Sequence, residues 1–303
     1  MPDFQEYRNI QFKAKSLVLI STINKILSEY VEMETVLTVR QIYYQLVARN
    51  FVKNNRNEYQ KVSNLIADGR IAGKIDWSLI EDRGREWIRR YRWESMSDRL
   101  EHVARTFHMD LWEGQENRVF VVVEKDALSG VLENVCHRYD VPLLAAKGYC
   151  SVSTLREFAE RDIMDSIDDG QTPMILYLGD HDPSGLDMDR DVKDRMEMFL
   201  NFWEREITLV RLALNIDQVK RFRLPHNFAK SSDKRFEKYR EQFGDESWEL
   251  DALDPAYMVD LVERNIVERI DMDKWEARVK EVESVKSELR KIADREANKG
   301  KRK

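Results

Sequence analysis

Cysteine is scarce in this sequence, since only Cys136 and Cys150 occur among 303 residues and neither belongs to a CxxC pair. This scarcity argues against a disulfide scaffold and against a structural zinc site. No run of 18 or more apolar residues is present, so no transmembrane helix is expected. Residues 1–15 lack the apolar core of a secretory signal. We therefore expect a protein of the reducing cytoplasm, with no membrane as partner.

The charge is distributed unevenly along the chain. The net charge is -6, yet residues 38–105 contain 14 Lys or Arg against 9 Asp or Glu, a local balance of +5, and acidic residues dominate from 157 to 194. A basic segment beside an acidic one is compatible with a DNA-binding domain joined to a metal-binding domain. Two ordinary solvated surfaces would give the same pattern, and charge alone favours neither interpretation.

Apolar spacing in the first third of the chain predicts short helices. Ile20, Ile23 and Leu27 are three and four positions apart, which is helical spacing, and Thr38 is placed as the N-cap of the next helix. The expected elements are helices over 9–34, 39–50 and 58–69, a β-ribbon over 71–82, and a helix over 85–107. Three short helices with a ribbon are typical of a winged-helix DNA-binding domain, which we expect over residues 1–115.

The middle of the chain alternates buried strands with helices. Continuous apolar runs predict strands at 118–124, 141–146, 174–179 and 207–214, with helices over 127–139, 152–167 and 185–203. This order favours an α/β fold with a parallel, doubly wound sheet, expected over residues 116–224. A helical C-terminal extension over 225–303, with a charged helix from about residue 273, completes the expected architecture.

Three carboxylates follow strands of the expected sheet. Glu124 closes the first strand, and Asp180 and Asp182 follow the third in the turn LGDHDPSG. The carboxyl ends of parallel strands are where such sheets place their chemistry, and alternate residues of an extended segment point the same way. Hard cations such as Mg²⁺ prefer carboxylate oxygens. A single acidic residue after a strand is more often a helix cap, so the prediction of a metal site depends on all three.

These motifs resemble a known family. The stretches VVVEKDALSGVL and LGDHDPSG, with the pair Lys147-Gly148 between them, resemble a Toprim domain, and more narrowly the A subunit of topoisomerase VI and its relative that makes meiotic double-strand breaks. The resemblance covers roughly residues 38–214. It implies Mg²⁺ held by Glu124, Asp180 and Asp182 and acting on DNA phosphates.

A tyrosine helix extends the resemblance into the N-terminal domain. The segment TVRQIYYQL is similar to the family's arginine-containing helix, which implies Tyr44 as the nucleophile and Arg40 as its assistant. A phenol is a poor nucleophile without a nearby cation, and residues four apart share one face of a helix. The alternative is that Tyr43 and Tyr44 both pack in an amphipathic helix. The sequence departs from the family at Gln41, where aspartate is usual.

Several further residues are candidates for DNA contacts or for metal binding. We expect DNA phosphate contacts from Lys125, although a lysine after a strand is often a solvated cap. Arginines in and just before the helix expected over 85–107 are also expected to contact phosphates: Arg83, Arg85, Arg89 and Arg90. His181 is not expected to bind the metal, because imidazole suits softer ions. Glu249 and Asp251 alternate in WELDALDP, which we interpret as a packed helix entry outside the site.

The resulting functional expectation is Mg²⁺-dependent DNA cleavage by transesterification through Tyr44. One alternative is a hydrolytic Toprim nuclease, perhaps defensive, with water as the nucleophile and Tyr44 structural; another is a DNA-binding subunit without activity. The resemblance implies a homodimer in which the tyrosine of one subunit works with the metal site of its mate. It also implies a separate ATPase subunit, since no phosphate-cradling P-loop is visible in this sequence.

Overall fold

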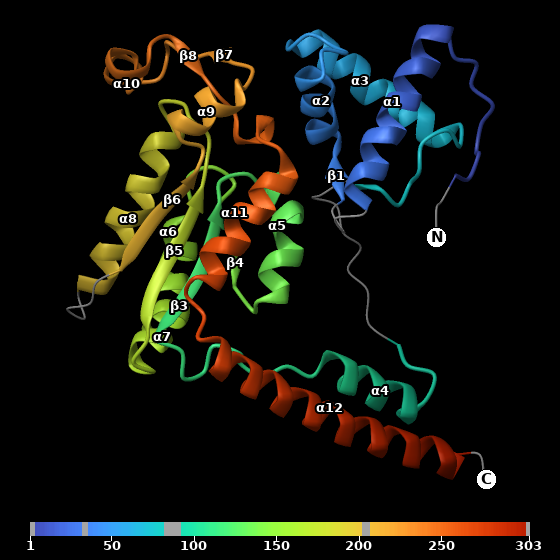
Figure 1. The fold of residues 1–303 in the computed structure, drawn as a ribbon, viewed down its shortest axis with the longest axis vertical. Coiled ribbons are helices and arrows are strands. Elements are labelled where there is room, and N and C mark those ends of the chain that lie inside the picture. The colour runs from blue at the N-terminus through green and yellow to red at the C-terminus, as the bar shows by residue number, and fades with distance from the viewer. Residues whose placement is uncertain (1–3, 32–35, 82–91, 202–206, 301–303) are drawn as a thin grey trace.

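The computed structural model describes residues 4–31, 36–81, 92–201 and 207–300. It has a mixed α/β fold, in which a four-stranded parallel sheet lies among helices beside a separate group of three N-terminal helices (Figure 1). Arg83, Arg85, Arg89 and Arg90, which were expected to contact DNA, lie outside the described residues.

The N-terminal group consists of α1 (Ala14–Val31), α2 (Val39–Ala48) and α3 (Arg56–Ile71). Thr38 caps α2 as predicted, in a reciprocal capping box with Gln41. The expected β-ribbon is not formed in the described part of this region. Instead β1 (Leu37–Thr38) pairs in parallel with β2 (Ile80–Glu81), and a single antiparallel bridge joins Glu6 to Ala72. Asp76 accepts a hydrogen bond from the backbone nitrogen of Ser78 at 2.8 Å, and this Asx turn interrupts the extended chain.

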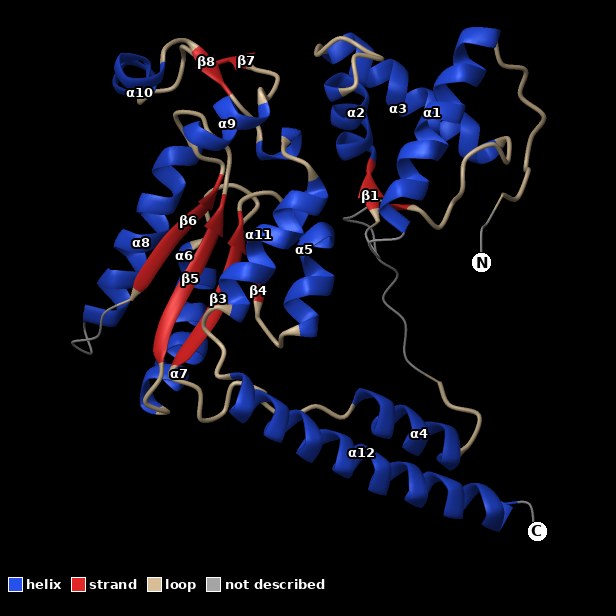
Figure 2. Ribbon diagram, in the orientation of Figure 1, coloured by secondary structure: helices blue, strands red, loops and turns tan. Residues whose placement is uncertain are grey.

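The sheet confirms the predicted parallel arrangement. Its strands are β3 (Asn117–Val123), β4 (Leu143–Ala145), β5 (Thr172–Leu178) and β6 (Thr208–Ala213), in the order β4-β3-β5-β6, with all neighbours parallel (Figure 2). Alternate residues of β3 enter two different cores. Val119, Val121 and Val123 pack with α5 (Asp126–Arg138), whereas Phe120 and Val122 pack with α8 (Gly185–Asn201). Both faces of the sheet are thus covered by helices, which explains the continuous apolar runs.

The helix expected over 152–167 is interrupted. It consists of α6 (Val152–Glu157), a π-helical segment (Phe158–Ile163) and α7 (Met164–Asp168). Phe158, Ala159 and Ile163 are buried on the sheet. The π-helical segment spreads these residues over a wider turn than an α-helix would.

The C-terminal part completes the core of the sheet domain. Its elements are α9 (Ile216–Phe222), β7 (Asn227–Phe228), α10 (Phe236–Phe243), β8 (Glu246–Ser247), a 3₁₀ turn (Leu250–Ala252) and α11 (Pro255–Val267). Trp248, Leu250 and Met258 are buried in the same apolar cluster as Val121 and Leu128. Residues beyond 224 are therefore partly integral to the α/β core.

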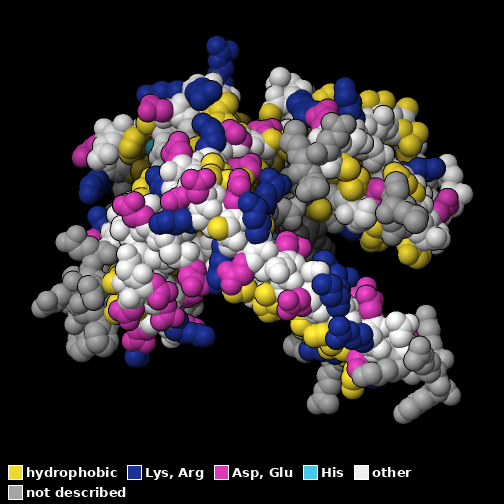
Figure 3. Space-filling model, turned by 60° about the horizontal axis from the view of Figure 1, so that its bottom comes forward, with side chains coloured by type: hydrophobic (Ala, Val, Ile, Leu, Met, Phe, Trp, Pro, Cys, Tyr) yellow, Lys and Arg dark blue, Asp and Glu magenta, His cyan; other side chains and the backbone are white. Residues whose placement is uncertain are grey.

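A long helical arm extends from the body. The last helix, α12 (Met272–Gly300), lies along α4 (Met96–Thr106), so segments far apart in the sequence are neighbours there (Figure 1). On the face shown in Figure 3, basic and acidic side chains are interspersed along this arm, as expected from pairs such as Lys286 with Glu283. None of the described helices has both the length and the apolar character needed to cross a membrane.

Candidate functional site

Two of the predicted carboxylates meet at the carboxyl end of the sheet. Glu124 follows β3 and Asp180 follows the neighbouring strand β5; the Glu124 Oε2 atom accepts a hydrogen bond from the Asp180 backbone nitrogen at 2.8 Å. Burial raises the pKa of Glu124 to about 7, and the charge of Asp180 adds to the effect. Burial likewise raises the pKa of Asp180, although Lys125 opposes it. The two side chains form a buried acidic pair whose charged forms are unfavourable without a cation.

Glycines allow the chain to approach this pair closely. A Cβ atom at Gly179 would lie 2.8 Å from Glu124 Oε2, and one at Gly185 would lie 2.3 Å from the carbonyl oxygen of Asp180. Real Cβ atoms do not come this close to other atoms, so a side chain at Gly179 would displace the Glu124 carboxylate and one at Gly185 would displace the backbone of Asp180. The glycines of LGDHDPSG are therefore required by the geometry of the site.

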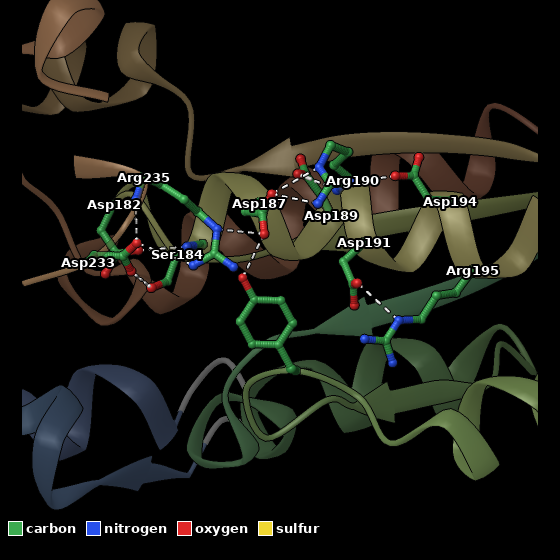
Figure 4. Close-up of polar contacts among 12 residues, drawn as sticks. Asp182, Ser184, Asp187, Asp189, Arg190, Asp191, Asp194, Arg195, Asp233 and Arg235 are labelled. Carbon is green, nitrogen blue, oxygen red and sulfur yellow. Dashed lines mark hydrogen bonds and ion pairs between the residues drawn. The ribbon is translucent and has the colours of Figure 1, made fainter. Parts of the chain in front are cut away.

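The third predicted carboxylate is turned toward the next helix. Asp182 Oδ1 accepts a hydrogen bond from the Gly185 backbone nitrogen at 2.6 Å, at the start of α8. Figure 4 shows Asp182 in the same region as Ser184 and Asp233, where the Ser184 hydroxyl donates to Asp233 Oδ2 at 2.5 Å. In this geometry Asp182 caps α8 and lies at the edge of the acidic pair.

Lys125 lies at the centre of the acidic residues. Its Nζ atom is 2.8 Å from Asp180 Oδ1, 3.2 Å from Glu249 Oε2 and 2.7 Å from Asp251 Oδ2. Burial alone would lower the pKa of Lys125, but the three carboxylates outweigh it and raise that pKa. The structure thus makes Lys125 a counter-ion of the acidic group, whereas the sequence suggested a phosphate contact or a solvated cap.

Arg40 connects α2 to the same carboxylates. Its guanidinium pairs with Glu249, and its Nε atom lies 3.4 Å from Asp251 Oδ2. Residues 248–254, here called the linking segment, therefore join the N-terminal helices to the sheet. Sequence reasoning treated this segment as a packed helix entry, and Leu250 and Ala252 are indeed buried in a 3₁₀ turn. The alternation of Glu249 and Asp251 was the signal that could have placed both carboxylates in the site.

The two tyrosines of α2 have different surroundings. Tyr44 is only 5% exposed, and the Arg40 guanidinium lies 5.9 Å from the centre of its ring. Burial raises the pKa of Tyr44, and the charge of Glu249 raises it further. The hydroxyl of Tyr43 instead accepts a hydrogen bond from the Asn55 backbone nitrogen at 2.8 Å, and its ring packs edge-on against Tyr59. Tyr43 thus holds the loop before α3.

One cavity brings these groups together. It has a volume of about 530 Å³ and opens between the N-terminal group and the carboxyl end of the sheet. Five residues that were predicted for the site line this cavity, and all belong to one chain: Arg40, Tyr44, Lys125, Asp180 and Asp182. Its walls also include residues that sequence reasoning did not place in the site: Asn54, Asn55, Arg56, Tyr59, Asn227, Phe228, Lys230, Ser247, Trp248 and Glu249.

The donor atoms suit Mg²⁺ in part. Glu124 and Asp180 supply hard oxygens with an excess of negative charge, and a buried oxygen nearby, Asp251 Oδ1, has no hydrogen-bond partner within the described chain. No group of three His, Cys, Asp or Glu side chains that could hold a metal ion occurs in that part of the chain, and Asp182 is hydrogen-bonded to the start of α8 instead. Mg²⁺ binds through one or two carboxylates and keeps several waters, so Glu124 and Asp180 fit it without a third direct ligand.

His181, between the two aspartates, has a packing role. Its Nδ1 atom lies 2.9 Å from the Tyr239 hydroxyl, and its ring contacts Phe243 and Trp248 edge-on. Burial lowers its pKa to about 4, so the imidazole is neutral near pH 7. The ring of His181 therefore packs among aromatic side chains.

The chain was also compared with known proteins. No family model matches it, and no curated protein matches it.

Proposed function

We propose that this chain is a Mg²⁺-dependent DNA-cleaving enzyme with a Toprim-type sheet domain and a winged-helix-type N-terminal domain. One observation carries the proposal: Arg40 and Tyr44 of α2 line the same cavity as Asp180 and Asp182 of the sheet. The candidate nucleophile thus shares one space with the candidate metal ligand Asp180. Glu124 is not among the residues that line this cavity, but it is hydrogen-bonded to Asp180.

The favoured reaction is transesterification. The Tyr44 oxygen attacks a backbone phosphorus, the bond from phosphorus to a deoxyribose oxygen breaks, and the strand remains attached as a tyrosyl phosphodiester. The phenol loses a proton in this step and the departing deoxyribose oxygen gains one, so the charges balance. Arg40, beside the ring, stabilises negative charge on the phenol oxygen, because its own charge opposes the rise that burial causes in the pKa of Tyr44. Bound Mg²⁺ would supply further positive charge at the phosphate, held by Glu124 and Asp180.

A second candidate is hydrolysis with water as the nucleophile. It is favoured by the surroundings of Tyr44, where burial and the charge of Glu249 raise the pKa of the phenol. A phenol that holds its proton more firmly than usual is a weaker nucleophile. In this alternative Tyr44 packs in the wall of the cavity, and the carboxylates and Mg²⁺ act on DNA without a covalent intermediate.

The experiment that separates the candidates is denaturation of a cleavage reaction. Protein, Mg²⁺ and end-labelled DNA are mixed, and the products are separated with and without protease treatment. We expect labelled DNA attached to the wild-type protein and none attached to Tyr44→Phe. Tyr43→Phe is the matched control, because it removes the hydroxyl of the adjacent ring and should leave attachment intact. Normal cleavage by Tyr44→Phe would establish hydrolysis, and an absence of any cleavage with Mg²⁺ would favour a non-catalytic DNA-binding subunit.

A further experiment tests whether one chain supplies both the tyrosine and the metal ligands of a site. Tyr44→Phe and Glu124→Ala proteins, each inactive alone, are mixed under conditions that exchange subunits. Cleavage in trans, which the resemblance implied, would restore nicking in the mixture. Because the cavity is lined by residues of one chain, we expect the mixture to stay inactive. The homodimer and the ATPase partner are not needed to complete this cavity and stay predictions.

A further inference from the structure

An exposed aromatic ring stands at the cavity. Phe228, in strand β7, is 81% exposed, whereas the wall residues Tyr43, Tyr44 and Trp248 are all buried. β7 is held in place by antiparallel pairing with β8. Phe228 therefore contributes little to the apolar core, yet its position is fixed by the strand that carries it.

The two walls beside Phe228 are tied together. Asn54 of the N-terminal group donates from Nδ2 to the His226 carbonyl oxygen and to Asn227 Oδ1, each at 3.3 Å. Asn227 donates in turn to Glu249 Oε1 of the linking segment, also at 3.3 Å. Through these contacts the Phe228 ring is positioned relative to the N-terminal helices and to the carboxylates that line the cavity, Asp180, Asp182 and Glu249.

Exposed cations accompany the ring. Arg56, at the start of α3, and Lys230, two residues after Phe228, both line the cavity, and neither forms an ion pair within the part of the chain that the structure describes. Arg40 and Lys125, by contrast, are bound to carboxylates. The cavity is thus lined by carboxylates, by the exposed ring of Phe228, and by two cations, Arg56 and Lys230, that are available to a phosphate.

We propose that the cavity binds an unpaired nucleotide of a DNA strand, with its base stacked on Phe228 and its phosphates near Arg56 and Lys230. Stacking on an aromatic ring beside cations is the general way in which proteins hold single strands. In a duplex each base is stacked and paired, so its face is not available to such a ring. The volume of about 530 Å³ falls within the usual range for enclosed small ligands. This inference rests on the proposed function and narrows its substrate to single-stranded or locally opened DNA.

The test measures DNA binding by the full chain in EDTA, so that cleavage plays no part. Fluorescence anisotropy is recorded with a labelled 12-nucleotide single strand and with the same strand in a duplex. We expect Phe228→Ala to weaken single-strand binding about tenfold and to leave duplex binding unchanged. Phe228→Trp should bind the single strand at least as tightly as the wild type. Phe51→Ala is the matched control, since Phe51 is 53% exposed and lies outside the cavity lining.

The outcomes separate this inference from the proposed function. Equal single-strand affinities of Phe228→Ala and the wild type, or equal losses for both DNA forms, would overturn the stacking role. Cleavage of the fully paired duplex by Phe228→Ala at the wild-type rate would also overturn it, while leaving the cleavage function in place. A wild-type protein that binds neither DNA form would refute DNA as the substrate. Thermal unfolding of each variant checks that the substitution at Phe228 or Phe51 leaves the fold intact.

Discussion

Replacing Lys125 with methionine removes the cation at the centre of the acidic residues. Its Nζ atom is within 3.2 Å of oxygens of Asp180, Glu249 and Asp251, and its side chain is 21% exposed. Removing one partner from a buried ionic group leaves uncompensated charge and costs roughly 3–5 kcal/mol. We expect Lys125→Met to lower the free energy of unfolding by an amount in this range at pH 8 without divalent cations.

The loss should depend on pH with a defined sign. Lys125 lowers the pKa values of Asp180 and Glu249, so both rise when the ammonium group is removed. The cost is therefore present above those pKa values and falls as the two groups take up protons. The carboxyl of Asp180 already has a raised pKa in the wild type because of burial. Urea unfolding at pH 8 and pH 5 should therefore show a smaller difference between variant and wild type at pH 5. Added Mg²⁺ should restore part of the stability at pH 8 by replacing the lost charge.

Lys61→Met is the matched control for this experiment. Lys61 also contacts a carboxylate, Glu58 Oε1 at 2.7 Å, but its side chain is 72% exposed. Exposed ion pairs contribute roughly 0–1 kcal/mol, so this variant should be close to wild type at both pH values. If Lys125→Met lost no more stability than Lys61→Met, or lost the same amount at pH 5 and pH 8, the assignment of Lys125 as the counter-ion would be wrong.

Three other variants test separate features. Burial raises the pKa of Glu124 to about 7 from its ordinary 4.5, so the charge of Glu124 costs stability above pH 7 and not below about 4.5. In EDTA, Glu124→Gln should therefore raise the free energy of unfolding at pH 8 by up to about 3 kcal/mol. An unchanged free energy at pH 8 would refute the raised pKa. Tyr30→Phe removes a hydrogen bond of 2.7 Å to Asp254, between α1 and the linking segment, and should cost about 1–2 kcal/mol in urea unfolding; an unchanged midpoint would show that this contact contributes nothing. Reversing Arg89 and Arg90 to Glu should weaken binding to all DNA sequences and flatten its salt dependence, whereas a salt-independent wild-type affinity would remove the electrostatic argument.

The sheet could be predicted from the sequence because its signal is local. Residues 119–123 are apolar without interruption, since β3 is covered by helices on both faces. The position of Glu124 and Asp180 at the carboxyl ends of strands likewise follows from the strand boundaries, whereas the pairing of β3 with β5 was learned from the fold. The prediction of a β-ribbon over residues 71–82 was wrong for the described residues, because a short turn centred on Asp76 breaks the extended chain there.

The remainder of the site depends on contacts between distant residues. Arg40 meets Glu249 across 209 positions of sequence, and Lys125 meets Asp251 across 126. No local pattern distinguishes a carboxylate that reaches another domain from one that reaches solvent. Glu249 and Asp251 were therefore visible as alternating acids in the sequence, but their place beside Arg40 and Lys125 became clear only from the fold.

The linking segment leaves the ribosome after the other residues of the candidate site. Tyr44, Lys125 and Asp180 are synthesised earlier, and domains generally fold in that order during translation. Until Glu249 and Asp251 emerge, Arg40 and Lys125 lack the carboxylates that hold α2 against the sheet. A nascent chain thus carries Arg40, Tyr44, Lys125 and Asp180 before the carboxylates that join them exist, and the candidate site is assembled only after residues 249 and 251 have been made.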